Sequence, residues 1–253
     1  PVLIELDCDG HRSGVTLDDP LLLTIGKLVN QENGLTLKGV LTHAGESYQC
    51  KTTEEIRAIA QTERDVAVKA AETLRQNGLP CPVVSVGSTP TANFATDLSG
   101  ITEVRAGVFM FYDLVMAELG VCDTSDIAVS VLTSIIGHQK EKGWIITDAG
   151  WMALSRDKGA SSKNKDYGYG LVCTRDGDLL PNFIVSDTNQ EHGIISNSDS
   201  TDIDWDRFKI GNMVRILPNH TCATSAMHDK YYVVNDTLEV IDVWDRINGW
   251  GPL

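Results

Sequence analysis

The sequence lacks a long apolar run and a basic N-terminal leader. No stretch approaches the roughly 20 apolar residues that a membrane helix requires. The first residues, PVLIELDCDG, contain no basic segment ahead of an apolar one. The chain has 253 residues, of which 42% are apolar. We therefore expect a soluble protein with a substantial hydrophobic core and no membrane partner.

Positive charge is also scarce. Lys and Arg together number 21 against 35 for Asp and Glu, which gives a net charge of −14. Because binding to the phosphates of a nucleic acid requires a basic face, this composition argues against a nucleic-acid partner. A small anionic cofactor needs only a few local donors and remains compatible with the acidic composition.

Closely spaced cysteine pairs are absent as well, since no C-x-x-C motif occurs. The six cysteines lie far apart, at Cys8, Cys50, Cys81, Cys122, Cys173 and Cys222. A disulfide framework is not expected in a chain of this size without a secretory leader. We expect reduced cysteines, mostly small core residues, in a cytoplasmic protein.

Residues 1–126 alternate between strand-like and helix-like patterns. The strand-like runs are VLIELD, LKGVLTHAG, PVVSVGSTPT and EVRAGVFMFYD. Helical spacing follows the first run, and a long helix is predicted from Thr52 to about Asn77. This helix starts with Thr52 and Glu55 in capping-box spacing. Strands that alternate with helices predict a parallel sheet.

Residues 127–253 have a different pattern. Short β-rich runs such as VSVLTSIIGHQ, GWIITDAGW, YGLVCT and MVRILPNH are separated by Gly, Asp and Asn turns. This pattern predicts a mostly antiparallel β-domain, with the domain boundary after residue 126.

The four strand–helix units of the first domain correspond to half of a (β/α)₈ barrel. In such barrels the active site forms at the carboxyl ends of the strands. The chain begins inside a strand, and a full barrel takes about 250 residues. We therefore expect an N-terminal segment of roughly 125 residues to be supplied as another chain or to have been removed.

His220 and Cys222 stand two residues apart in the stretch ILPNHTCATS. In a strand, residues i and i+2 point to the same face, so an imidazole and a thiol here could bind one metal ion. A buried cysteine beside a surface histidine is the alternative, because a metal site needs more than two ligands.

Seven motifs occur along the sequence in the order IELDCDGHRSGV, VLTHAGESY, VSVGSTPT, EVRAGVFMFYD, DAGWMALSRD, NQEHG and PNHTCAT. The fold type III pyridoxal-phosphate enzymes carry similar motifs in the same order, and the sequence resembles their D-serine dehydratase and D-threonine aldolase family over essentially its whole length. The resemblance implies an alanine-racemase-like barrel that binds the cofactor, and a C-terminal β-domain that binds a divalent metal ion. The family's Schiff-base lysine has no match in this sequence, which agrees with the expected missing half of the barrel.

The resemblance also implies cofactor contacts. Arg105 and Gly107 resemble an Arg-x-Gly segment in which the arginine faces the pyridine nitrogen. The backbone amides of the glycine and its successor, here Val108, hold the phosphate there. Arg12 lies at another strand end and competes with Arg105 for the pyridine role. Tyr48 resembles a tyrosine that contacts the cofactor.

Two hydroxyl residues at the end of the third strand are further candidates. Ser88 and Thr89 could meet the cofactor phosphate through a hydroxyl and an amide, although a simple helix N-cap is the alternative. His43 could stack on the pyridine ring or be a structural histidine.

For His220 and Cys222 the resemblance implies metal binding. A soft thiolate favours Zn²⁺ over Mn²⁺ or Mg²⁺, with Mn²⁺ or Co²⁺ still possible. The implied reaction is dehydration of a D-3-hydroxy amino acid, D-serine or D-threo-3-hydroxyaspartate, to a 2-oxo acid and ammonia. The metal would act as a Lewis acid on the β-hydroxyl group.

Two other functions remain open. Retro-aldol cleavage of D-threonine is one, and Cys222 counts against it because the related aldolases carry His-x-Asp. A non-catalytic remnant that binds a ligand or partner is the other. The resemblance further implies a homodimer.

Overall fold

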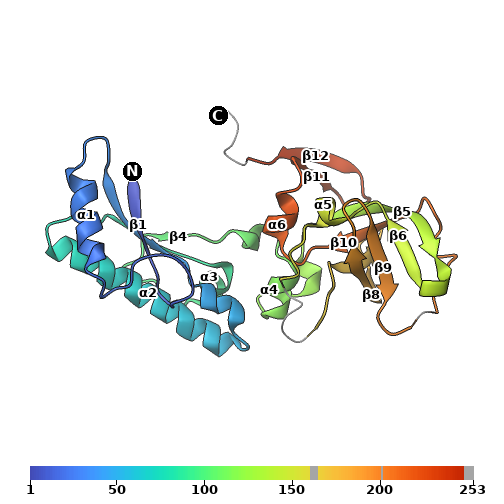
Figure 1. Ribbon diagram of the computed structural model, residues 1–253, viewed down its shortest axis with the longest axis horizontal. Coiled ribbons are helices and arrows are strands. Elements are labelled where there is room, and N and C mark those ends of the chain that lie inside the picture. Colours follow the sequence, from blue (N-terminus) through green and yellow to red (C-terminus); the bar gives the residue numbers. More distant parts are fainter. Residues whose placement is uncertain (160–164, 201, 248–253) are drawn as a thin grey trace. The chain divides into compact units, whose positions relative to one another are not determined.

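A parallel four-stranded sheet and a closed antiparallel barrel form the two units of the chain. The computed structural model describes residues 1–159, 165–200 and 202–247 (Figure 1). The first unit comprises Pro1–Met110 with Leu119–Val121, and the second comprises Phe111–Glu118 with the described residues from Cys122 onward. Each unit has its own apolar core.

The first unit confirms the predicted parallel sheet. Its strands pair in the order β1-β2-β3-β4, and every pair is parallel. The strands are β1 (Val2–Leu6), β2 (Leu37–Thr42), β3 (Val83–Val86) and β4 (Glu103–Val104). The helices are α1 (Leu21–Gln31), α2 (Thr53–Gln76) and α3 (Thr89–Phe94), with 3₁₀ turns η1 (Gly45–Gln49) and η2 (Val108–Met110).

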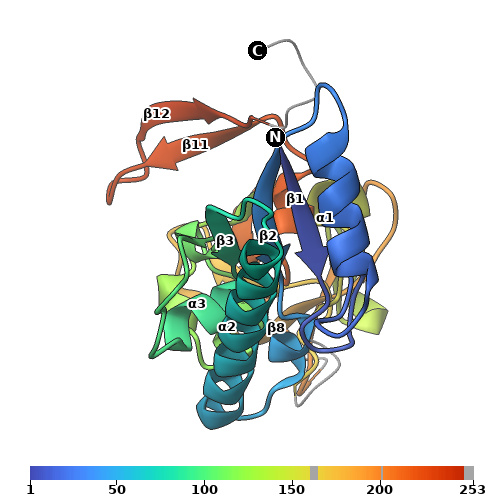
Figure 2. The ribbon, with the colours of Figure 1, turned by 90° about the vertical axis from the view of Figure 1, so that its left-hand side faces the viewer.

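The long helix α2 begins and ends where the sequence predicts. Its capping box forms as expected: Glu55 donates its backbone N–H to Thr52 Oγ1 at 3.2 Å, and Thr52 donates its own to Glu55 Oε2 at 3.3 Å. Ala67, Ala70 and Ala71 are fully buried against the sheet in the core shared with α1. Small side chains let the helix lie close to the strands, and α1 and α2 cover the same face of the sheet (Figure 2).

The second unit confirms the predicted antiparallel β-domain. Six strands close into a barrel in the order β10-β5-β6-β9-β8-β7, which leaves the barrel no free edge. The strands are β5 (Val131–Gln139), β6 (Trp144–Thr147), β7 (Leu171–Thr174), β8 (Leu179–Thr188), β9 (Gly193–Asn197) and β10 (Met213–Leu217). A hairpin of β11 (Lys230–Val234) and β12 (Val240–Asp245) follows.

Short helices connect and flank the barrel strands. They are α4 (Leu114–Glu118), α5 (Trp151–Leu154) and α6 (Thr221–Ser225), with 3₁₀ turns η3 (Thr124–Asp126) and η4 (Lys140–Lys142). Within the described ranges every helix is too short or too polar to cross a membrane. All six cysteines are free thiols.

Candidate functional sites

The carboxyl ends of the four parallel strands carry most of the predicted cofactor residues. The turns after β1 and β2 are joined by hydrogen bonds: Glu46 donates its backbone N–H to Asp9 Oδ2 at 2.9 Å, and His11 Nδ1 lies 2.8 Å from Glu46 Oε1. Gly45 lies so close to His11 that a Cβ at position 45 would come within 2.4 Å of the imidazole. A larger residue at position 45 would require the His11 side chain to move.

The two candidate arginines lie in different surroundings. Arg105 is half-buried and donates to Thr42 O at 2.6 Å and to the Ser85 hydroxyl. Its guanidinium is therefore fixed across β2 and β3. Arg12 lies in an exposed turn after β1. The structure thus holds Arg105 rigidly and leaves Arg12 at the surface.

The backbone around Gly107 is open on one side. A Cβ at position 107 would meet no atom within 4 Å, so the space beside the backbone could admit a ligand. Val108 is buried and begins η2. This open cradle fits the predicted approach of a phosphate to the amides of both residues.

Tyr48 and His43 lie together. Their rings stack with centroids 5.9 Å apart and an angle of 15° between the planes. Burial lowers the pKa of His43, and the positive charge of Arg12 lowers it further. The turn after β2 therefore carries two nearly parallel aromatic rings, with the pKa of His43 shifted toward the neutral form.

Ser88 serves as the N-cap of α3. Its Oγ accepts from the backbone N–H of Thr91 at 3.2 Å and lies 3.0 Å from Ser47 Oγ. Thr89 is the first residue of α3, and both Ser88 and Thr89 are 2% exposed. The capping alternative is confirmed for Ser88, while a phosphate contact through either residue stays a prediction.

The expected strand placement of His220 and Cys222 is wrong. Strand β10 ends at Leu217, and His220 is instead the N-cap of α6, which contains Cys222. The helix begins here because buried Asp113 accepts the backbone N–H of Thr221 at 2.9 Å. The two side chains therefore meet across a helix N-terminus and not on one face of a strand.

His220 and Cys222 nevertheless converge. Cys222 interacts with the imidazole and is the first cause of the raised pKa of His220, and His220 Nδ1 lies 2.6 Å from Asp157 Oδ2. Contact with Cys222, and then with Asp157, raises the pKa of His220 to about 9. Burial opposes ionisation of Asp157, but the bond to His220, the bond from the backbone of Gly159 and the charge of His220 together outweigh it and leave the pKa of Asp157 lowered. An ionised Asp157 accepts from Nδ1, so Nε2 is the nitrogen left to bind another group.

Asp157 is itself held in place by its own loop. Asp157 donates its backbone N–H to Ser155 Oγ at 3.2 Å, and its Oδ1 accepts from Gly159 N at 2.8 Å. Thr224 of α6 donates its hydroxyl to Leu154 O at 2.9 Å, which joins α6 to the end of α5. Asp157 is the last residue of the motif DAGWMALSRD, but a functional role for it was not predicted from the sequence.

The donor set suits a borderline-soft metal ion. His220 offers Nε2, and the exposed Cys222 offers a thiolate sulfur. Across the described part of the chain, no group of three or more His, Cys, Asp or Glu side chains is arranged to hold a metal. The pair would therefore leave other coordination positions open.

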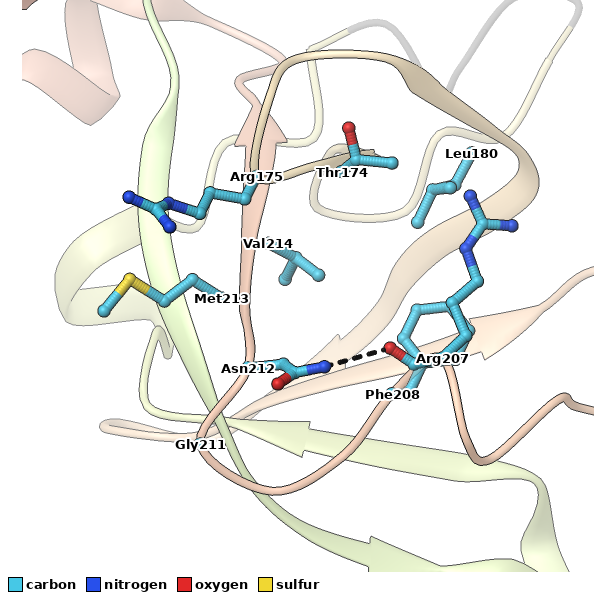
Figure 3. A pocket seen from close by; sticks show the side chains of 9 residues that line it. All are labelled: Thr174, Arg175, Leu180, Arg207, Phe208, Gly211, Asn212, Met213 and Val214. Carbon is cyan, nitrogen blue, oxygen red and sulfur yellow. Dashed lines mark hydrogen bonds between the residues drawn. The ribbon is translucent and has the colours of Figure 1, made fainter. Parts of the chain in front are cut away.

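A separate hollow of about 420 Å³ lies beside the barrel strands. Figure 3 shows that the guanidinium groups of Arg175 and Arg207 point away from each other. The predicted site residues do not line it. It is not a candidate for the predicted chemistry.

Two family models match the chain. Residues 1–114 match the alanine racemase N-terminal domain, and residues 128–234 match the putative serine dehydratase domain. The chain is 53% identical to D-threo-3-hydroxyaspartate dehydratase of Delftia sp. (strain HT23), over 98% of this chain and 66% of that protein. It is 32% identical to D-serine dehydratase of Dictyostelium discoideum, over 98% of this chain and 64% of that protein.

Solved structures that are similar to this chain include variants of D-threo-3-hydroxyaspartate dehydratase. A cysteine-to-alanine variant of D-threo-3-hydroxyaspartate dehydratase, described as metal-free, superimposes with a TM-score of 0.92 at 52% identity, over 98% of this chain and 66% of that one. In another solved variant a histidine two positions before that cysteine is replaced by alanine.

The chain spans slightly less than two thirds of the length of the curated relatives named here. The chain belongs to the D-serine dehydratase and D-threonine aldolase family of alanine-racemase-like proteins.

Proposed function

We propose that the protein is a carbon–oxygen lyase that depends on pyridoxal 5′-phosphate and a divalent metal ion. The substrate would be a D-3-hydroxy amino acid, D-threo-3-hydroxyaspartate or D-serine, and the products a 2-oxo acid and ammonia. The observation that carries this proposal is the interaction of His220 with Cys222, together with the bond between Asp157 and Nδ1 of the same imidazole. Dehydratase names among the relatives at 53% and 32% identity support it.

The residues at the strand ends of the first unit would hold the cofactor. When bound, pyridoxal phosphate supplies an electron sink for removal of the Cα proton of the substrate. Arg105, fixed by Thr42 O and Ser85, is better placed than the exposed Arg12 to face the pyridine nitrogen. A guanidinium at that position would disfavour protonation of the nitrogen. Amides at Gly107 and Val108 would hold the phosphate.

In the second unit, His220 Nε2 and Cys222 Sγ would hold Zn²⁺, with Mn²⁺ or Co²⁺ as alternatives. The ion supplies Lewis acidity that turns hydroxide into a better leaving group. Asp157 would keep the imidazole in the tautomer that presents Nε2. The two solved variants of the relative, altered at a histidine and a cysteine with this same spacing, support the assignment.

The proposal extends to architecture. The four parallel strands would form half of an alanine-racemase-like (β/α)₈ barrel, which the match over residues 1–114 supports. Self-association as a homodimer stays a prediction, which the molar mass in solution would check.

Product analysis tests the proposed reaction. The purified protein, together with the lysine-bearing segment that the family resemblance implies, would be supplied with pyridoxal 5′-phosphate and ZnCl₂ and incubated with D-threo-3-hydroxyaspartate, D-serine or D-threonine. We expect a 2-oxo acid and ammonia in equal amounts, and their loss on chelation. Glycine with an aldehyde would instead show retro-aldol cleavage. Absence of turnover in protein that binds both cofactor and metal would support the non-catalytic alternative.

A further inference from the structure

A buried carboxylate lies beneath the candidate cofactor turns, and the proposed reaction assigns it no role. Glu63, near the middle of α2, is only 2% exposed. Its Oε1 accepts from the backbone N–H of Ala44 at 3.1 Å and from that of Gly87 at 3.0 Å. Ala44 lies two residues after β2, and Gly87 directly follows β3. One carboxylate oxygen therefore holds two turns that are far apart in the sequence.

Three buried hydroxyl groups complete a ring of hydrogen bonds with Glu63. Ser47 donates to Ala44 O at 2.7 Å, and its Oγ lies 3.0 Å from Ser88 Oγ. Ser88 Oγ lies 2.9 Å from Thr91 Oγ1, and Thr91 counteracts the effect of burial on the pKa of Glu63. Because Ser47 donates its one hydroxyl proton to Ala44 O, Ser88 donates either to Ser47 or to Thr91. The three hydroxyl groups thereby link the turn after β2 to the turn after β3 beside Glu63.

The cost of burying Glu63 shows why an apolar residue would not serve. Burial raises the pKa of Glu63, while the bonds from Thr91, Gly87 and Ala44 oppose the rise. An apolar side chain at position 63 would avoid the cost of burying a charge. It would also leave two buried backbone N–H groups without an acceptor. The buried carboxylate of Glu63 is therefore explained by the two turns that it holds through the backbone N–H groups of Ala44 and Gly87.

We propose that Glu63 is the positioning residue of the cofactor site. It fixes the turn that carries Tyr48 relative to the turn that carries Ser88 and Thr89, and so sets the affinity for a phosphate-bearing cofactor. Glu63 acts through these turns and not by touching the cofactor. The inference rests on the proposed function, because it takes the two turns as the cofactor site.

The test compares three variants with the wild-type protein. Glu63→Ala removes the acceptor, Glu63→Gln retains an amide oxygen that can accept both N–H groups, and Glu72→Ala removes an exposed carboxylate of the same helix as a control. Each protein would be titrated with pyridoxal 5′-phosphate. Amide hydrogen exchange at Ala44 and Gly87 would be measured without cofactor.

We expect Glu63→Ala to weaken cofactor binding on the order of tenfold, and to speed exchange at both amides. Glu63→Gln should restore both readouts close to wild type, and Glu72→Ala should change neither. Should Glu63→Ala fail to fold, Ser47→Ala removes the hydroxyl link to Ser88 and the bond to Ala44 O, and it is expected to weaken binding in the same direction.

Two results would overturn the inference. Glu63→Ala, or Ser47→Ala in its place, could bind the cofactor as tightly as wild type. Alternatively, Glu63→Gln could lose as much affinity as Glu63→Ala while both amides remain protected, which would show that charge and not turn geometry matters. A wild-type protein that binds no pyridoxal 5′-phosphate would instead refute the proposed function, and the exchange data alone would then report whether Glu63 holds the turns.

Discussion

The two units hold their candidate functional groups in contrasting ways. In the first unit, a ring of buried hydroxyl groups around Glu63 fixes the turns from within. In the second unit, His220 and Asp157 each remain 39% exposed in their side chains, and one hydrogen bond sets the orientation of the imidazole. A cofactor with a large, fixed shape benefits from a rigid cradle. A metal ion that exchanges water and substrate needs open positions.

This contrast predicts that single substitutions act more severely at the metal pair than at the cofactor turns. The largest effect is expected for Cys222→Ala. Removing a ligand from a two-residue site should reduce bound zinc to background and lower metal-dependent turnover by more than about 100-fold. Metal analysis and kinetics would measure both, with Cys122→Ala as the matched control in the same unit. The absorbance of bound cofactor should persist in Cys222→Ala. A zinc content in Cys222→Ala equal to that of wild type would contradict the assignment.

Asp157→Asn should have the next largest effect. The amide cannot accept from Nδ1 with the strength of a carboxylate, so the imidazole loses its fixed orientation. We expect zinc affinity to fall by about 10- to 100-fold, measured by competition with a chelator of known affinity. Asp148→Asn is a suitable control, because Asp148 binds Thr133 and Ser134 and not His220. Equal zinc affinity in Asp157→Asn and wild type would contradict the proposal that Asp157 orients the imidazole of His220.

Substitution of Arg105 or Arg12 tests which of these two arginines of the first unit binds the cofactor. Arg105→Ala should weaken binding of pyridoxal 5′-phosphate by about tenfold, since a half-buried, preset guanidinium is lost. Arg12→Ala should change it much less, because Arg12 lies in an exposed turn. A titration of both variants decides the matter, and a larger loss for Arg12→Ala would reverse the assignment.

The smallest effect concerns stability and pH. A carboxyl group whose pKa is raised on folding stabilises the folded state at low pH, and this contribution is lost as pH rises through the folded-state pKa. Glu63 has such a raised pKa. Unfolding by urea at several pH values should therefore show wild type losing stability relative to Glu63→Gln as pH increases above the usual glutamate range. Parallel curves for the two proteins would contradict a raised pKa.

The sequence predicted the first unit better than the second. Alternating strands and helices pair with their neighbours in parallel, so the order of the sheet follows the order of the chain. The capping box at Thr52 and Glu55 is likewise a local signal. In the barrel, β10 closes onto β5 and β7, which are distant in sequence, and no local pattern predicts that closure.

The same distinction holds for the candidate sites. The His-x-Cys spacing was visible, but its strand placement was wrong because the capture of Thr221 N by Asp113 depends on a residue 108 positions away. Asp157 and Glu63 were missed for a similar reason. An aspartate in a loop and a glutamate in a helix look ordinary until the fold places them against His220 or against two strand ends.

An anomalous-difference map from crystals of the zinc-loaded protein tests the central claim most directly. We expect one strong zinc peak at about 2.0–2.1 Å from His220 Nε2 and about 2.3 Å from Cys222 Sγ, with Asp157 still bound to Nδ1. A peak elsewhere, a peak bonded through Nδ1, or no peak beside these two side chains would contradict it.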